Sequence, residues 1–399
     1  MASGEKQYLI GRRDQSDHGL LWIGKYLALD RSSGAPVMMD VLRPHAVLIC
    51  GKRGYGKSYT MGVIIEEIAR LPGSLRNNFS AIVIDTMGIY SCMGRSCDDL
   101  RQMNEWGIAP GGINIKVHAP TTHVEDGSGI QKFEIPSSSL SAYDYCELLG
   151  IDPVSESGSV LIGAISDLKS FTIDELASRI STLDVRNEVK ETLHGLLSMV
   201  SGWRLFSKGA TFDSLLEPGS VNIIDLSGYG HDPEIRSAIV ASLARALYDL
   251  RVRARRREAD RREVPLIWMF IDEAHMFLDS SKESRAGAVL INEWLRQGRQ
   301  PGLSLVLATQ RPSALGKDVL SQADIVICHR LTYKDDIDAM ESVRPSYVKE
   351  PVRDAMQRLG SIRGAALIVD DTTESYHVVR IRPRGSEHGG GEPVVFDAD

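Results

Sequence analysis

Residues 51–58 read Gly-Lys-Arg-Gly-Tyr-Gly-Lys-Ser and match the phosphate-loop pattern G-x-x-x-x-G-K-[ST] at every fixed position. Glycines at these positions let backbone N–H groups turn inward around phosphate oxygens, where a Cβ atom would interfere. An apolar run precedes the loop at residues 45–50, and a helical pattern follows it at residues 59–68. The strand, loop and helix context that the motif requires is therefore present, and the pattern predicts a nucleoside triphosphate site.

The loop gives a role to each of its polar residues. Lys57 would place its ammonium group between the β- and γ-phosphates, and Ser58 would bind Mg²⁺ through its hydroxyl. The helix that begins here would direct its N-terminal dipole at the anion. The residues expected to bind ATP are Gly51, Lys52, Arg53, Gly54, Tyr55, Gly56, Lys57, Ser58 and Tyr59.

The composition is that of a soluble protein with ample material for a core, since 43% of its 399 residues are hydrophobic and 25% are charged. No apolar run approaches the ~20 residues of a membrane helix, and the N-terminus lacks the apolar segment of a secretory signal. Five cysteines, an odd number, indicate reduced thiols. We therefore expect a cytoplasmic protein that works without a membrane. A net charge of −7 argues against a surface coated with nucleic acid but allows a local basic surface or pore.

Short apolar runs alternate with helical patterns along most of the chain. Strands are expected at residues 45–50, 80–85, 221–226, 266–272, 303–308, 325–328 and 365–369. This alternation predicts an α/β fold with a mainly parallel sheet covered by helices on both faces, over residues 45–384.

Three segments depart from this alternation. Residues 1–44 hold short β-like pieces, too few for an independent barrel. Residues 137–212 read as a helical insertion, with a capping box at residues 172–175. Residues 385–399 are rich in glycine and acidic side chains and are expected to form a disordered tail.

A second part of the predicted site lies where the apolar run 267–271 ends on two carboxylates. Asp272 would hold Mg²⁺ through its water shell, as a strand-end carboxylate does in phosphate-loop enzymes. Glu273, one residue further, would orient and deprotonate the water that attacks the γ-phosphate. His275 is interpreted as a polar linker near the site rather than as a catalytic group.

Gln310 follows the neighbouring strand, residues 303–308, and would lie near the γ-phosphate and sense it. The alternative is that this segment is only a polar turn closed by Pro312. Arg296 and Arg299 come before this strand, at its opposite end from Gln310. They could reach a neighbouring subunit's nucleotide as arginine fingers, or remain surface cations. Arg330, after the strand at residues 325–328, is a further candidate for this role in trans.

The densest basic run covers residues 251–257 and continues at Arg261 and Arg262. Two interpretations stay open. Cations are favoured at a helix C-terminus, so a solvated helix end explains several of these arginines. Contact with DNA phosphates is the alternative.

With these motifs in place, the chain resembles the HerA branch of the HerA and FtsK superfamily of ring-forming ATPases over residues 45–384. The similar segments are the phosphate loop, Asp85 with Gly88 and Tyr90, the helical insertion, Asp-Glu-Ala-His at 272–275, Gly298-Arg299, Ala-Thr-Gln-Arg-Pro-Ser at 308–313, 319–322, 329–332 and 378–384. The resemblance implies a RecA-like P-loop core in a homo-hexamer that hydrolyses ATP at subunit interfaces and moves double-stranded DNA through its centre. Family members often work with a nuclease partner in DNA end resection or in defence against phage.

Two features depart from that family's pattern. Family members commonly carry an N-terminal β-barrel on which the nuclease docks, whereas about 45 residues precede the phosphate loop here. The family often has Pro-His-Gly-Glu-Tyr after the strand-end aspartate, whereas this chain reads Thr-Met-Gly-Ile-Tyr at 86–90. The usual nuclease docking mode and the role of that glutamate are therefore not expected to carry over.

Three functions are compatible with the motifs. The leading hypothesis is an ATP-driven translocase of double-stranded DNA. The second is a non-translocating oligomeric ATPase that assembles or switches an effector nuclease. The third, a related pump at a membrane, is disfavoured because the sequence has no transmembrane or basic amphipathic segment.

Overall fold

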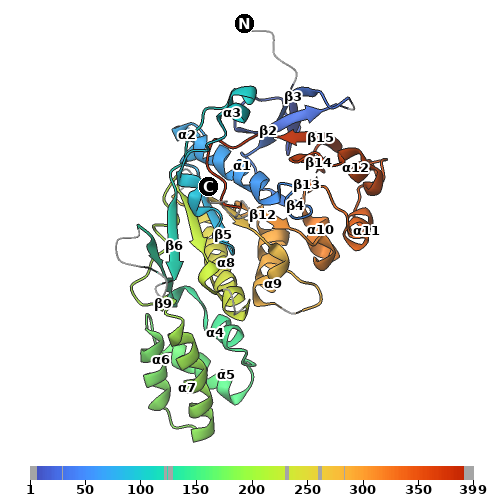
Figure 1. Ribbon diagram of the computed structural model, residues 1–399. Coiled ribbons are helices and arrows are strands. Elements are labelled where there is room, and N and C mark those ends of the chain that lie inside the picture. Colours follow the sequence, from blue (N-terminus) through green and yellow to red (C-terminus); the bar gives the residue numbers. More distant parts are fainter. Residues whose placement is uncertain are drawn as a thin grey trace, which may run out of the picture.

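A computed structural model of the chain describes residues 7–28, 30–120, 124, 129–229, 233–258, 263–282 and 284–390. Within them a 13-stranded sheet runs through the molecule (Figure 1) in the order β1-β3-β2-β15-β14-β13-β4-β12-β11-β5-β10-β6-β7. Its strands are β1 (Tyr8–Ile10), β2 (Leu20–Leu27), β3 (Ser33–Asp40), β4 (Ala46–Cys50), β5 (Phe79–Asp85), β6 (Lys116–Pro120), β7 (Gln131–Phe133), β10 (Val221–Asp225), β11 (Leu266–Ile271), β12 (Leu303–Thr309), β13 (Ile325–His329), β14 (Ala365–Asp370) and β15 (Ser375–Ile381). A small separate sheet pairs β8 (Ile135–Pro136) with β9 (Phe206–Ser207).

The α-helices alternate with these strands along the chain. They are α1 (Lys57–Arg70), α2 (Gly73–Arg76), α3 (Leu100–Trp106), α4 (Ala142–Leu149), α5 (Glu156–Ser166), α6 (Ile173–Ser181), α7 (Asn187–Gly202), α8 (Pro233–Arg255), α9 (Arg285–Val289), α10 (Lys317–Gln322), α11 (Lys334–Ser342) and α12 (Val352–Leu359). A π-helical turn, Leu290–Leu295, continues α9. Among the described residues, no helix is both long and apolar enough to cross a bilayer.

The predicted mainly parallel sheet is confirmed. Every neighbouring pair from β13 to β7 is parallel, whereas β14 and β15 pair antiparallel with their neighbours. The N-terminal strands do not stand apart from this sheet, because β2 pairs with β15 and β3 with β2. Residues before the phosphate loop therefore extend the same sheet that carries it.

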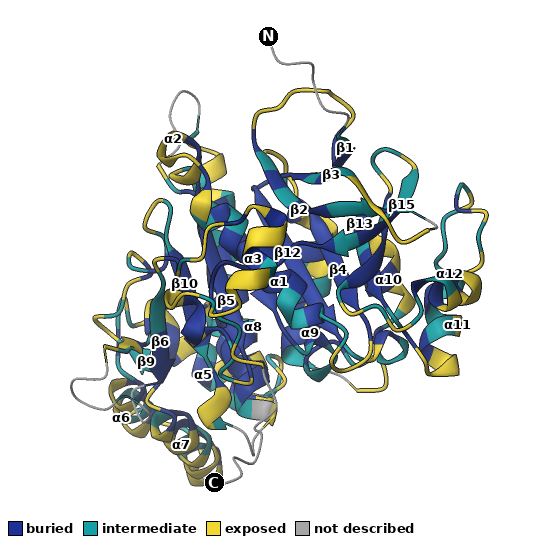
Figure 2. Cartoon of the chain, turned by 45° about the horizontal axis from the view of Figure 1, so that its top comes forward, coloured by how far each residue is buried: buried dark blue, intermediate teal, exposed yellow. Residues whose placement is uncertain are grey.

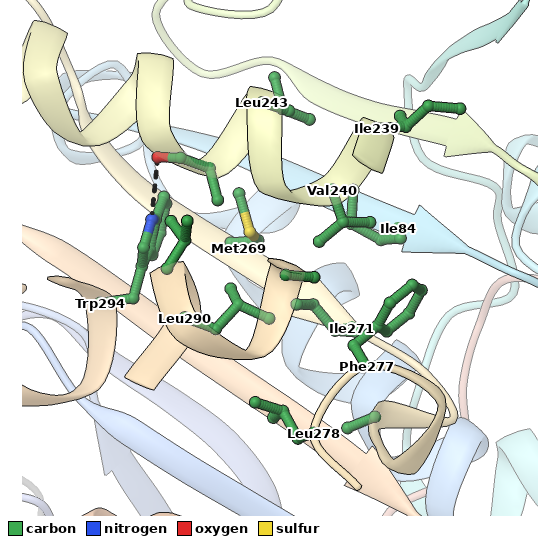
Figure 3. Packing of buried hydrophobic residues seen from close by; sticks show 14 of the residues in the cluster. Ile84, Ile239, Val240, Leu243, Met269, Ile271, Phe277, Leu278, Leu290 and Trp294 are labelled. Atoms are coloured by element: carbon green, nitrogen blue, oxygen red, sulfur yellow. Dashed lines mark hydrogen bonds between the residues drawn. The ribbon is translucent and has the colours of Figure 1, made fainter. Parts of the chain in front are cut away.

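Hydrophobic side chains on the two faces of the sheet form separate cores, as a parallel sheet covered on both sides requires. Val47 and Ile49 pack with the buried residues of α1, whereas Leu48 faces the core under α8. Figure 3 shows part of that second core, to which α8 contributes Val240 and Leu243 and β11 contributes Met269. There the indole Nε1 of Trp294 donates to the backbone oxygen of Ala244 at 3.0 Å, which fixes the π-helical turn against α8.

Helices α4 to α7 fall within the segment expected to be a helical insertion and group together at the bottom of the view in Figure 1, beyond β6 and β9. The predicted capping box is present: the N–H of Glu175 donates to Thr172 Oγ1, and the Glu175 carboxylate accepts from the N–H of Thr172. The outer surfaces of α6 and α7 are exposed in Figure 2, in contrast to the buried central strands.

The start of the expected disordered tail is packed rather than disordered. Ser386 is buried, and its N–H and hydroxyl donate to Glu66 Oε2 at 2.8 and 2.6 Å. Glu66 lies fully buried in α1 and also pairs with Arg382 at 3.0 Å. A buried carboxylate needs such partners, and residues 382–386 supply them. The remainder of the expected tail, residues 391–399, lies outside the described residues.

A buried histidine immediately before β4 predicts a pH-dependent stability. His45 Nδ1 lies 2.8 Å from Asp324, and Nε2 lies 3.4 Å from Asp40. Burial alone would lower the pKa of His45, but these two carboxylates raise the pKa to about 9. Arg12 and Arg299 also face this cluster, at 3.4 Å from Asp40 and 3.5 Å from Asp324.

Because the folded pKa of His45 lies above the unfolded value near 6.5, its stabilisation is fully present below about pH 6.5 and is lost as pH rises towards 9. The shift corresponds to roughly 3 kcal/mol. We expect the free energy of unfolding, measured by denaturant titration, to fall over this pH range in the wild type and to fall less in His45→Gln. Parallel curves for the two proteins would contradict the assignment.

Candidate nucleotide-binding and hydrolysis site

The phosphate loop connects β4 to α1 at the carboxyl edge of the parallel strands. Gly56 caps α1 with φ 112°, a backbone conformation that side chains disfavour. A Cβ on Gly51 would lie 2.5 Å from the Cβ of His329, so only glycine fits there. No side chain caps α1, and the first N–H groups of the helix are therefore available to an anion.

His329 supports this loop from the neighbouring strand β13. Its Nδ1 donates to the backbone oxygen of Ala365 at 3.0 Å, and its Nε2 accepts from the Thr60 hydroxyl at 2.8 Å. Burial lowers the pKa of His329 to about 4, so the ring is neutral at physiological pH. The sequence did not assign this role, because Thr60 and His329 are far apart along the chain.

Lys57 and the two carboxylates meet at one place. Lys57 is 5% exposed, and burial lowers the pKa of its ammonium group, while Glu273 and Asp272 act in the opposite direction. The ammonium group of Lys57, at the start of α1, therefore faces the carboxylates of Asp272 and Glu273 at the end of β11, as the motifs predicted. A γ-phosphate at Lys57 would lie beside Glu273.

Asp272 is buried and fixed by two donors. The Tyr90 hydroxyl lies 3.0 Å from Asp272 Oδ2 and 3.3 Å from the backbone oxygen of Ser58, and the N–H of Glu273 donates to Oδ1 at 2.8 Å. Tyr90 thus links the two residues expected to hold Mg²⁺. Carboxylate, hydroxyl and water oxygens are the donors that Mg²⁺ prefers, so the residues present fit this ion.

Tyr90 itself is positioned by Asp85, the last residue of β5. Asp85 accepts the N–H groups of Met87, Gly88 and Tyr90 at 3.1, 2.8 and 2.8 Å. Burial raises the pKa of Asp85 to about 6, against the effect of these donors. The loop after β5 therefore serves the site through Tyr90, although it lacks the glutamate of the related pattern.

Glu273 has the left-handed backbone angles φ 50° and ψ 46°, which cost energy in a residue with a side chain. Its Oε1 accepts from the Gln310 amide, and its Oε2 lies 3.3 Å from His275 Nδ1. Burial lowers the pKa of His275, with Glu273 acting against it. The same Nδ1 lies 3.3 Å from the Thr309 hydroxyl, so His275 is a polar linker, as expected.

The three candidate arginines lie in two different places. Arg296 pairs with Asp318 at 2.9 Å and Arg299 with Asp324 at 3.5 Å, and their side chains are 47% and 63% exposed. Arg299 lies before β12, at the amino end of the strands, so it points away from its own nucleotide site.

Arg330 lies against its own phosphate loop instead. Its backbone oxygen accepts the N–H of Lys52 at 2.9 Å, and its guanidinium lies over the Tyr55 ring at 5.7 Å. The expected role in trans is therefore not favoured for Arg330, because this geometry places it beside the nucleotide of the same subunit.

Tyr59 was expected to bind nucleotide, but its side chain meets the C-terminal segment. Its hydroxyl accepts the N–H of Arg384 at 2.6 Å, and its ring lies 5.2 Å from that of His388.

Gly62, one turn later, leaves room for the Arg384 guanidinium, since a Cβ there would lie 2.3 Å from Nη1. A glycine inside a helical pattern signals such a close approach, but not its partner. The other loop residues, Lys52, Arg53 and Gly54, are exposed.

Comparison with known proteins agrees with this geometry. The family model described as "Helicase HerA, central domain" matches residues 21–247. The chain is 27% identical over 369 residues to the DNA double-strand break repair helicase HerA of Pyrococcus furiosus, covering 82% of this chain and 63% of that protein. It is 23% identical to the corresponding Sulfurisphaera tokodaii protein, over 95% of this chain and 72% of the relative. The chain thus spans less than two thirds of the Pyrococcus relative.

Solved structures show the same fold. VirB4 of Thermoanaerobacter pseudethanolicus superimposes with a TM-score of 0.62 at 14% identity, covering 94% of this chain and 98% of VirB4. The bacterial conjugative coupling protein TrwBdeltaN70 gives a TM-score of 0.52 at 15% identity, covering 96% and 92%. The family model covers more than half of the chain, and its match includes the phosphate loop, so this chain belongs to the HerA helicase family and has the P-loop ATPase fold.

Proposed function

We propose that the chain hydrolyses ATP and uses the energy to move double-stranded DNA through a homo-hexameric ring. The observation that carries the proposal is the meeting of Lys57, Asp272, Glu273 and Gln310 at the carboxyl ends of β4, β11 and β12. The HerA relatives, which are named as DNA repair helicases, support DNA as the substrate.

The residues divide the hydrolysis step between them. A water molecule beside Glu273 attacks the γ-phosphorus, its proton passes to the Glu273 carboxylate, and the bond from the γ-phosphorus to the bridging oxygen breaks to give ADP and phosphate. Lys57 balances the charge of the β- and γ-phosphates. Mg²⁺, held by Ser58 and through water by Asp272, would supply further charge neutralisation when bound.

Gln310 is placed to link the base to the phosphate. Its amide donates to Glu273 Oε1, so it occupies one lone pair of the base. A γ-phosphate would compete for the same amide. This contact supports the proposed sensing role of Gln310, which would act through the orientation of Glu273.

A ring is part of the proposal because Arg299, a candidate arginine finger, lies at the end of the strands opposite to its own nucleotide site. Arg299 is 63% exposed at the amino ends of the strands, from where it would reach the nucleotide of a neighbouring subunit. A head-to-tail ring brings that edge to the next subunit's site. A nuclease partner, a role in phage defence and a cytoplasmic location remain parts of the same proposal.

The test is steady-state ATP hydrolysis by the purified oligomer with linear duplex, with single-stranded DNA and without nucleic acid, across a salt series. Strong stimulation by duplex that weakens as salt rises is the expected result, because phosphate contacts release counterions. A rate that no DNA changes would contradict the translocase and favour an ATPase that switches a partner protein.

A further inference from the structure

The arginine run at the end of α8 divides into parts with different surroundings. Arg251 is fully buried, and its Nε and Nη2 donate to the backbone oxygen of Pro301 at 2.9 and 2.7 Å. Its Nη1 donates to Val264 and to Glu258, both at 2.8 Å. Arg251 therefore ties the helix end to the segments that lead into β11 and β12, and it is unavailable to a ligand.

The next two arginines fit a solvated helix end. Arg253 and Arg255 are exposed in the last turn of α8, where the helix dipole favours cations. Arg255 also lies 3.5 Å from Glu258. These interactions account for both side chains without a ligand.

Arg256 and Arg257 are not explained in this way. Both follow the last helical residue, Arg255, and the dipole effect falls off within the final turn. Both are exposed, and neither forms an ion pair with any residue that the structure describes. In a chain of net charge −7, these two cations, which have no ion pair among the described residues, form a local positive surface together with Arg253 and Arg255. We call the exposed side chains Arg253, Arg255, Arg256 and Arg257 the basic edge.

The position of the basic edge separates it from the hydrolysis site. Arg251 bonds to Pro301 and Val264, which precede β12 and β11, so the basic edge lies at the amino ends of the parallel strands. Lys57 and Glu273 lie at the carboxyl ends. A ligand on the basic edge would therefore be distinct from the nucleotide bound by the same subunit.

The chemistry of the basic edge fits a chain of phosphates. Its charged groups are all guanidinium groups, whose planar N–H pairs match phosphate oxygens. None of the large apolar side chains that are exposed on the described surface lies within residues 251–258, so this segment itself offers no apolar anchor to a protein partner.

We propose that the basic edge binds the phosphate backbone of duplex DNA, with Arg256 and Arg257 as its main contacts, an inference that rests on the proposed function. The contact is independent of base sequence, because guanidinium groups on phosphates do not read base edges. It would hold the duplex at the amino ends of the parallel strands, away from the nucleotide bound by the same subunit.

The test uses the full-length oligomer with Arg256→Gln and Arg257→Gln combined. Binding of a linear duplex of mixed sequence is followed by fluorescence anisotropy across a salt series, and ATP hydrolysis is measured with and without the duplex. The matched control combines Arg101→Gln on α3 and Arg353→Gln on α12. The side chains of these two arginines are 91% and 61% exposed, and replacing them removes the same net charge.

We expect duplex binding to weaken roughly tenfold at ~0.15 M salt, with the slope of log Kd against log salt reduced by about one for each lost phosphate contact. Hydrolysis without DNA should stay unchanged, and the control should bind like the wild type. An unchanged salt slope in the double variant, or a loss of DNA-free hydrolysis, would overturn the inference alone. Failure of the wild type to bind duplex would overturn the proposed function together with it.

Discussion

Replacing Glu273 with glutamine is expected to reduce ATP turnover by about 10²- to 10⁴-fold while leaving ATP binding intact. Glutamine keeps the size of the side chain and its contact with Gln310, but it cannot accept the proton of the attacking water. The Asp272 carboxylate and Lys57 keep their places, so the affinity for the triphosphate should change little. Single-turnover hydrolysis and binding of a fluorescent ATP analogue separate the two effects.

Lys57→Ala provides the contrasting variant, since it removes the cation on the β- and γ-phosphates and should abolish binding as well as turnover. Full turnover in Glu273→Gln would reject Glu273 as the base. Loss of binding in that variant would instead show that the left-handed backbone at residue 273 needs the carboxylate to hold the site together.

Mixing two inactive proteins is expected to restore hydrolysis when one is Arg299→Ala and the other Glu273→Gln. If Arg299 acts in trans, a site is complete when its own subunit keeps Glu273 and the neighbour keeps Arg299. At equal amounts and random assembly, about a quarter of the sites meet both conditions, because each has a probability of one half. The same experiment with Arg296→Ala tests the other candidate at that edge.

For Arg330 we expect the opposite outcome, no recovery of hydrolysis on mixing. Its guanidinium lies over Tyr55 of its own phosphate loop, so Arg330→Ala and Glu273→Gln damage different groups of a site that needs both from one subunit. No mixed site is then complete, and mixing should restore nothing. An arginine on the γ-phosphate is worth about 10³-fold or more in rate, so recovery is easily measured.

Subunit exchange, followed by fluorescence transfer between labelled proteins, is the control for both mixtures. Exchange without recovery at any ratio would rule out Arg299 and Arg296 as arginine fingers. Recovery with Arg330→Ala would show that its contact with Tyr55 gives way to a contact across the interface when the ring assembles.

The parts of the site that the sequence predicted are those set by short-range rules. The phosphate loop is a local motif, and Asp272, Glu273 and Gln310 follow parallel strands, whose carboxyl ends meet at one edge of the sheet. That Gln310 contacts Glu273 follows from this rule, since β11 and β12 are neighbours.

The parts that the sequence missed depend on contacts between residues far apart in the chain. Glu66 reads as a solvated helix residue, yet it is buried because Arg382 and Ser386 return to pair with it. The composition of the tail predicted disorder, because composition carries no information on contacts such as that between Ser386 and Glu66. The position of Arg330 beside Tyr55 likewise required the pairing of β13 with β4.

The central claim is tested most directly by movement along DNA. The measurement is the ATP-dependent displacement of a third strand bound to a linear duplex, followed in real time with wild type and Glu273→Gln. The account predicts displacement that needs hydrolysable ATP, starts later as the third strand is placed further from the end, and is absent in the variant. Rapid ATP hydrolysis on the same duplex without any displacement of the third strand would contradict a translocase.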